Sequence, residues 1–87
     1  GRFELEEVVP YRELVDEIES EINKMPPKMR EVFNLSRKEQ LSHKQIAAQL
    51  NIAESTVREQ VKRALKLLRI RLKDRPYLLY ILLHLLR

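Results

Sequence analysis

Two arginines, a lysine and a glutamate lie close together past the middle of the chain, at Arg58, Glu59, Lys62 and Arg63. Because a helix turns by about 100° per residue, this spacing gathers all four on one side of a helix. Guanidinium and ammonium groups can donate to guanine edges in a DNA major groove, which is wide enough for one helix. A carboxylate can accept a hydrogen bond from a cytosine amino group but repels phosphate. We therefore expect Glu59 to contribute to sequence specificity rather than to DNA affinity. The pattern predicts a base-reading helix face.

Residues that suit phosphate contacts flank this face. They are Lys44, Ser55, Thr56 and Lys66. The backbone amides of Ser55 and Thr56, at the start of a helix, would add contacts of their own.

The composition favours an all-α fold and a polyanionic partner. The 87 residues make one small domain with a single Gly, four Pro and many helix formers. We expect a small helix-turn-helix bundle of about four helices plus an apolar C-terminal helix. Residues 1–23 hold eight acidic side chains against two arginines, whereas residues 24–87 hold fifteen Lys and Arg against five acids. Such a split is expected when one end of a domain faces nucleic acid.

Few residues suggest catalysis or metal binding. His43 and His84 are the only histidines, they lie far apart in the sequence, and Cys is absent. We therefore expect no enzyme, no cofactor and no metal site. The sequence shows no charged and then apolar leader, so we expect a cytoplasmic location.

Two helices should come first in the domain, which we place at residues 11–73 after a linker remnant at residues 1–10. Apolar residues recur every three or four positions from Tyr11 to Lys24, which predicts the first helix. The Pro26-Pro27 pair ends it and favours the first turn of the second, which should fade near Arg37 to Glu39.

A tight corner should join the third and fourth helices. Ser42 and Gln45 have the spacing of a capping box and start a scaffold helix at about residues 42–50. Asn51 can end that helix because Asn tolerates the left-handed backbone conformation. Ala53 precedes the next helix and lacks the hydroxyl of a usual cap.

The fourth helix, Glu54 to Lys73, should carry the base-reading face, with the recognition helix at about residues 54–70. One of its stripes is apolar and should build the core: Val57, Val61, Ala64, Leu65, Leu68 and Leu72. The other stripe is polar and should be exposed: Ser55, Arg58, Glu59, Lys62, Arg63 and Lys66.

The last residues form an apolar tail. From Tyr77 to Leu86 every residue except His84 is apolar, which predicts a helix within residues 76–87 that begins after Pro76. The stretch is too short to span a membrane, which takes about 20 apolar residues. A helix that is apolar on every side usually marks an interface.

An ordered set of short motifs runs through the middle of the chain. They are Met25-Pro26, Arg30-Glu31-Val32-Phe33, Leu41-Ser42, Gln45-Ile46-Ala47, Thr56-Val57, and Arg63-Ala64 through Leu68-Arg69. In this order the stretch from Met25 to Arg69 resembles region four of the extracytoplasmic-function (ECF) class of bacterial sigma factors. It departs from that pattern at Gln40 and Asn51, where the family often has Gly, and at Ala53, where it often has a capping Ser.

The resemblance implies a DNA-binding domain that reads the upstream (minus thirty-five) element of double-stranded promoter DNA for transcription initiation. It also implies that the first two helices grip the flap-tip helix of the β subunit of the RNA polymerase core. The same apolar groove would take an anti-sigma factor. Its residues would be Leu14, Ile18, Ile22, Val32 and Phe33.

Other functions remain open on the sequence alone. LuxR-type response regulators have a DNA-binding domain of similar layout, although Met25-Pro26-Pro27 replaces its usual Leu-Thr-x-Arg-Glu opening. Alternatively, the chain is a protein-interaction module whose tail packs into the groove of its own chain or of a neighbouring copy. The second arrangement would give a homodimer through Tyr77 to Leu86. The tail could instead lie in a membrane interface as an anchor.

Overall fold

Four helices and a short helical turn make up the described part of the chain. The computed structural model describes residues 11–78 and 80. The helices are α1 (Tyr11–Asn23), α2 (Pro27–Arg37), α3 (His43–Leu50) and α4 (Glu54–Arg71). Helical backbone resumes at Pro76 and includes residues 76–78 and 80. The described residues contain no strand, so the predicted all-α fold is confirmed. The predicted linker (1–10) and most of the apolar tail (79 and 81–87) lie outside the described residues.

The helix boundaries follow local signals in the sequence. Pro26 lies at the N-cap of α2, and the second proline takes the first helical position, where a missing N–H is tolerated. At the start of α3 the capping box is complete. Gln45 N donates to Ser42 Oγ at 3.1 Å, and Ser42 N donates to Gln45 Oε1 at 2.8 Å. α4 ends at Arg71, two residues before the expected Lys73.

Within the described residues, two non-glycine residues have a left-handed backbone, and both lie in connections between helices. Asn51 ends α3 with φ 57° and ψ 49°, as expected for an Asn that replaces Gly. Gln40, between α2 and α3, has φ 56°. At both positions the family often has Gly, and at both this chain adopts the left-handed conformation, which Gly takes at lower cost than other residues do.

The apolar side chains form two clusters. The larger one, which we call the main core, joins α1, α2, α4 and the residue Leu78 near the C-terminus. Its buried members are Ile18, Ile22, Met25, Phe33, Ala64, Leu68, Leu72 and Leu78. The smaller one, the turn core, consists of Val32, Ile46 and Val57 with partly buried neighbours. α2 and α4 contribute to both clusters and so connect the two ends of the domain.

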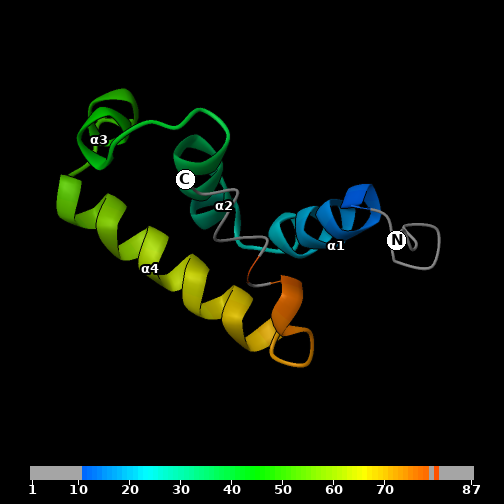
Figure 1. The fold of residues 1–87 in the computed structure, drawn as a ribbon. Coiled ribbons are helices and arrows are strands. Elements are labelled where there is room, and N and C mark those ends of the chain that lie inside the picture. The colour runs from blue at the N-terminus through cyan, green and yellow to red at the C-terminus, as the bar shows by residue number, and fades with distance from the viewer. Residues whose placement is uncertain (1–10, 79, 81–87) are drawn as a thin grey trace.

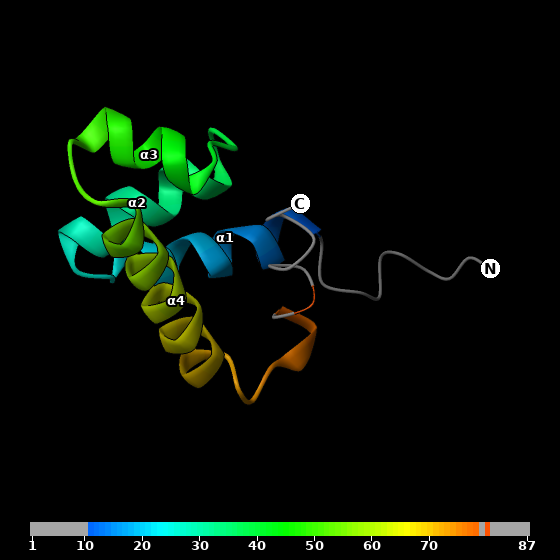
Figure 2. The ribbon, with the colours of Figure 1, turned by 90° about the vertical axis from the view of Figure 1, so that its left-hand side faces the viewer.

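Figures 1 and 2 show how these clusters are arranged in space. α3 lies at the N-terminal end of α4, next to α2, whereas α1 lies toward the other end of α4. Beyond α4 the chain turns back toward α1. α1 is also tied to α2 by Arg37, which is only 8% exposed and pairs with Glu19 at 3.0 Å.

Candidate nucleic-acid interface

The corner between α3 and α4 is built from backbone geometry and the turn core. The left-handed Asn51 reverses the chain, and Ile52 N donates to Ala47 O at 3.0 Å, which closes the end of α3. Ile46 of α3 and Val57 of α4 are both fully buried, so the two helices pack directly against each other. This arrangement is a helix-turn-helix in which α3 holds the N-terminal half of α4 in place.

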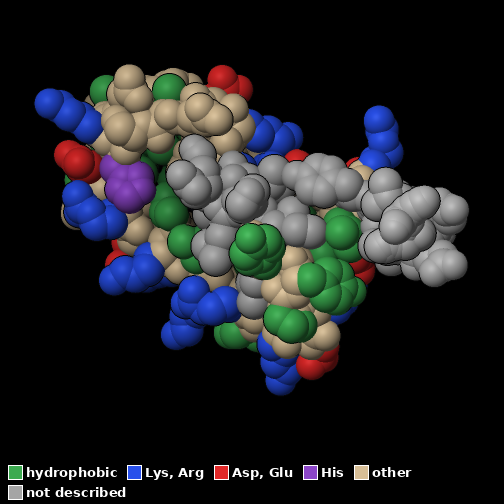
Figure 3. All heavy atoms as spheres, viewed as in Figure 1, with side chains coloured by type: hydrophobic (Ala, Val, Ile, Leu, Met, Phe, Trp, Pro, Cys, Tyr) green, Lys and Arg blue, Asp and Glu red, His purple; other side chains and the backbone are tan. Residues whose placement is uncertain are grey.

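The predicted base-reading residues all project from one exposed side of α4. Arg58, Glu59, Lys62 and Arg63 are exposed, and Ser55 and Lys66 extend the face at either end. The opposite stripe is buried or partly buried, as predicted, because it forms the cores. Figure 3 shows Lys and Arg side chains gathered along the edge of the molecule where α4 lies. A long helix with a free cationic face is the feature that a major groove accepts.

Two ion pairs lie on this face. Arg58 pairs with Glu54 at 3.6 Å, and Arg63 pairs with Glu59 at 3.3 Å, each one helical turn apart. All four side chains are about half exposed or more, so each pair contributes little to stability. In the free chain, the two glutamates hold the guanidinium groups close to the surface of α4. The role of Glu54 was missed in the sequence, although its spacing to Arg58 is the signal for such a pair.

Comparison with known protein families decides what this architecture is. The family model described as "Sigma-70, region 4" matches residues 16–68, from the middle of α1 through most of α4. The chain belongs to the sigma-70 region 4 family. Neither a curated protein nor a solved structure matches the chain. The match agrees with the resemblance to region four and not with the LuxR-type alternative.

Membership of the sigma-70 region 4 family carries a coarse functional assignment. The family is a DNA-binding domain of transcription initiation and not a catalytic one. Its partners are promoter DNA and RNA polymerase. Of the surfaces of this sigma region 4 domain, the exposed cationic face of α4 is the one suited to DNA.

The predicted phosphate contacts lie around the same face, with one correction. Lys44, in the first turn of α3, and Lys66 of α4 are exposed. Thr56 N, however, donates to Ala53 O at 3.0 Å, so its amide is engaged within the helix. Thr56 therefore has its hydroxyl, rather than its amide, to offer to a phosphate. Ser55 is exposed beside it.

The structure does not bring the five predicted groove residues together on one open surface. Ile18, Ile22 and Phe33 are fully buried in the main core, with Leu14 packed at its edge. Val32 belongs to the turn core instead. Val32 and Phe33 are neighbours on α2, about 100° apart around the helix axis, so they face different partners. The groove on α1 and α2 is thus filled in this chain, and Leu78 is among the residues that fill it.

An exposed apolar side chain near the C-terminal end of α4 was not expected from the sequence. Ile70 is 59% exposed and lies in a hollow with Met29 and Leu67. Lys24, Arg63, Lys66 and Arg71 also line this hollow. The sequence did contain a sign of this exposure, because Ile70 falls outside the apolar stripe of the fourth helix that builds the core.

Two kinds of site are absent from the described residues: a metal-binding group of side chains and a membrane-spanning helix. No group of three or more His, Asp or Glu side chains within 11–78 and 80 is placed to hold a metal. His43 is half-buried in the first turn of α3, and His84 lies outside the described residues. None of the described helices is both long enough and apolar enough to cross a membrane.

Proposed function

We propose that this chain is the promoter-reading domain of an ECF-class sigma factor and that α4 reads the minus thirty-five element. The observation that supports the proposal is the exposed face of α4 with Arg58, Glu59, Lys62 and Arg63. This face lies opposite the cores, and α3 packs on the other side of α4 through the turn core. The arginines and the lysine donate to guanine edges, and Glu59 accepts from a cytosine amino group. Lys44, Ser55, Thr56 and Lys66 contact phosphates and fix the register of the helix on the duplex.

We further propose that the apolar surface of α1 and α2 docks on the flap-tip helix of the polymerase β subunit, or on an anti-sigma factor that competes with it. Such docking would place the domain beside the promoter in the cytoplasm. Ile18, Ile22 and Phe33 are large, apolar and adjacent, which suits an apolar helix as the partner. Because these residues are covered in the described structure, docking requires that they become accessible.

The DNA proposal is tested by fluorescence anisotropy with duplexes enriched by the protein from a randomised pool. If Lys44, Lys66 and the cationic side chains of the base-reading face together neutralise four or five phosphates, log affinity should fall against log salt with a slope of about −4. Arg63→Ala should weaken the best duplex by about 1 to 3 kcal/mol and relax preference at one base pair. Lys66→Ala should weaken all duplexes alike and reduce the slope by about 1.

Arg12→Ala is the matched control, because Arg12 is an exposed arginine on α1, outside the proposed DNA face. It should leave affinity and base preference unchanged. A flat salt response would refute DNA binding by this face. An Arg63→Ala variant that loses affinity equally on every duplex would instead place Arg63 on the phosphates.

A further inference from the structure

The chain reverses its direction directly after α4. Leu72 ends the helix and is fully buried, and Arg75 N donates to Leu72 O at 2.9 Å. Leu78 N then donates to Arg75 O, also at 2.9 Å. These turns carry Leu78 back into the main core, where it has no exposed surface. We call residues 72–78 the strap.

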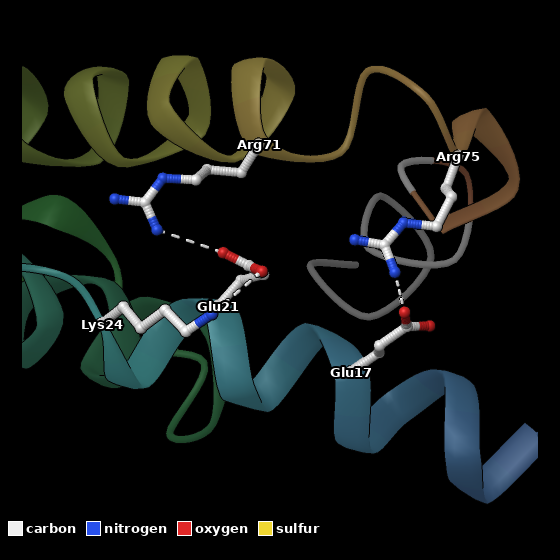
Figure 4. Close-up of polar contacts among 5 residues, drawn as sticks. All are labelled: Glu17, Glu21, Lys24, Arg71 and Arg75. Atoms are coloured by element: carbon white, nitrogen blue, oxygen red, sulfur yellow. Dashed lines mark hydrogen bonds and ion pairs between the residues drawn. The ribbon is translucent and has the colours of Figure 1, made fainter.

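Two ion pairs fasten the strap and the end of α4 to α1. Glu21 accepts from Arg71 at 3.2 Å and also pairs with Lys24 at 3.5 Å. Glu17, one turn earlier on α1, pairs with Arg75 of the strap. Figure 4 shows the two glutamates on the same side of α1, each pointing toward its arginine. We call the Glu17–Arg75 and Glu21–Arg71 pairs the latch.

Leu78 of the strap covers part of the apolar surface of α1 and α2, and Leu68 of α4 belongs to the same cluster. Leu78 packs in one cluster with Ile18 and Ile22 of α1 and with Phe33 of α2. If the strap moved away, the part of these side chains that Leu78 covers would be exposed as an apolar patch to which an apolar helix could bind. Tyr77 and Tyr80 are 52% and 68% exposed, so they lie on the outer side of the returning chain. A partner side chain cannot occupy the space that Leu78 fills while Leu78 is docked.

We propose that the strap and latch form an autoinhibitory contact: Leu78 of the strap covers the docking groove, and the latch opposes the movement of the strap that would admit an apolar partner helix. The inference rests on the proposed docking of the flap-tip helix, and it names what controls that docking. The Glu17–Arg75 pair of the latch is partly exposed, with 34% for Arg75 and 41% for Glu17, so this pair is weak enough to open. The occupant of the groove in the free chain is its own residue Leu78, not a second copy.

Charge reversal and charge exchange in the full chain test the proposal. Arg75→Glu places a carboxylate against Glu17 and should open the one latch pair that holds the strap itself, while the Glu21–Arg71 pair at the end of α4 remains. The double variant Glu17→Arg with Arg75→Glu restores an opposite pair with its signs exchanged and should close it again. Lys73→Glu makes the same change of charge two residues away, on an exposed side chain that makes none of the described ion pairs, and serves as the control.

Two measurements are made on each variant. Amide hydrogen exchange at Leu78 reports whether the strap is docked, because its N–H is bonded to Arg75 O only in the turn. Titration with a synthetic flap-tip helix peptide reports whether the groove is accessible. Arg75→Glu should lose protection at Leu78 and bind the peptide about twofold to fivefold more tightly, the effect of one exposed ion pair. The exchanged pair should return both values to those of the original chain, and Lys73→Glu should change neither.

Leu78→Ala provides a second route, because it removes the side chain that fills the groove and leaves the latch intact. It should tighten peptide binding by about tenfold or more, provided that circular dichroism shows the helices retained. Equal peptide affinity in the original chain, Arg75→Glu and Leu78→Ala would overturn the autoinhibition. Unchanged protection of Leu78 in Arg75→Glu would overturn the latch.

Peptide binding and DNA affinity are both measured on the same variants, so that failure of this inference can be told apart from failure of the proposed function. If the peptide binds all variants equally, the docking proposal stands and the inference fails. If it binds no variant, including Leu78→Ala, both the docking proposal and the inference fail, while promoter binding by α4 is judged by its own salt slope.

Discussion

Ala53 lies at the N-cap of α4, and replacing it with Ser should stabilise the domain. The backbone of Ala53 is extended (φ −69°, ψ 146°), and no side chain caps the helix. Ser42 holds the same position at the start of α3 with a similar backbone (φ −72°, ψ 163°), and its hydroxyl accepts from Gln45 N at 3.1 Å. A serine at position 53 therefore finds a backbone that already suits a cap.

The size of the effect can be worked from this comparison within the molecule. A Ser cap in place of Ala contributes about 1 kcal/mol, which for a domain of this size raises the melting temperature by about 4 to 8 °C. The gain should stay below the loss caused by Ser42→Ala. The third residue of α4 is Thr56, which cannot reach back as Gln45 does, so only half of a capping box can form.

Thermal unfolding followed by circular dichroism measures both changes. Ala48→Ser is the matched control, since Ala48 is exposed within α3 and the same replacement there should destabilise by about half a kcal/mol. Ala53→Ser should also bind promoter DNA slightly more tightly, because the first turn of the recognition helix is then better ordered. A melting temperature for Ala53→Ser that equals or falls below that of the original chain would refute the placement of the helix start.

Two further substitutions test the rest of the fold by urea unfolding. Gln40→Gly should stabilise the domain by up to about 1 kcal/mol, because a left-handed backbone (φ 56°) costs a non-glycine residue about 1 to 2 kcal/mol. The greater backbone entropy of Gly in the unfolded chain offsets part of this gain. An unchanged urea midpoint would show that the backbone at Gln40 is not strained. Glu19→Ala should destabilise by about 1.5 to 3 kcal/mol, because it leaves the buried Arg37 without its carboxylate. Glu13→Ala, at an exposed acid on the same helix, should change little by comparison, and equal losses would contradict a special role for the pair.

Features that depend on a few neighbouring residues could be read from the sequence. The capping box of Ser42 and Gln45, the left-handed Asn51 and the missing cap at Ala53 all follow from local backbone chemistry, and the structure has each of them. The two stripes of α4 follow from helical periodicity alone. The candidate DNA face was predictable for the same reason: an exposed stripe is fixed once the buried stripe opposite to it is known.

Features that depend on how helices meet could not be read in this way. The sequence shows that Val32 and Phe33 are apolar, but not that one packs toward α3 and the other toward α1. Arg37 is polar and lies where α2 was expected to fade, yet it is buried, with Glu19 of α1 paired to it at 3.0 Å. Both outcomes are set by contacts between residues distant in the sequence, which periodicity does not report.

The division into two cores explains how one small domain can separate its two proposed tasks. The DNA face runs along α4 from Ser55 to Lys66, and its N-terminal part is held by the turn core through Val57, whereas Leu68 and Leu72 belong to the main core. Arg58 and Arg71 are thirteen residues apart on the same helix, which is about 20 Å. Opening the strap disturbs contacts of the main core but none of those that set the corner at Asn51. A partner bound in the opened groove would therefore be held by α4, acting as a rigid rod, at a fixed distance from the promoter.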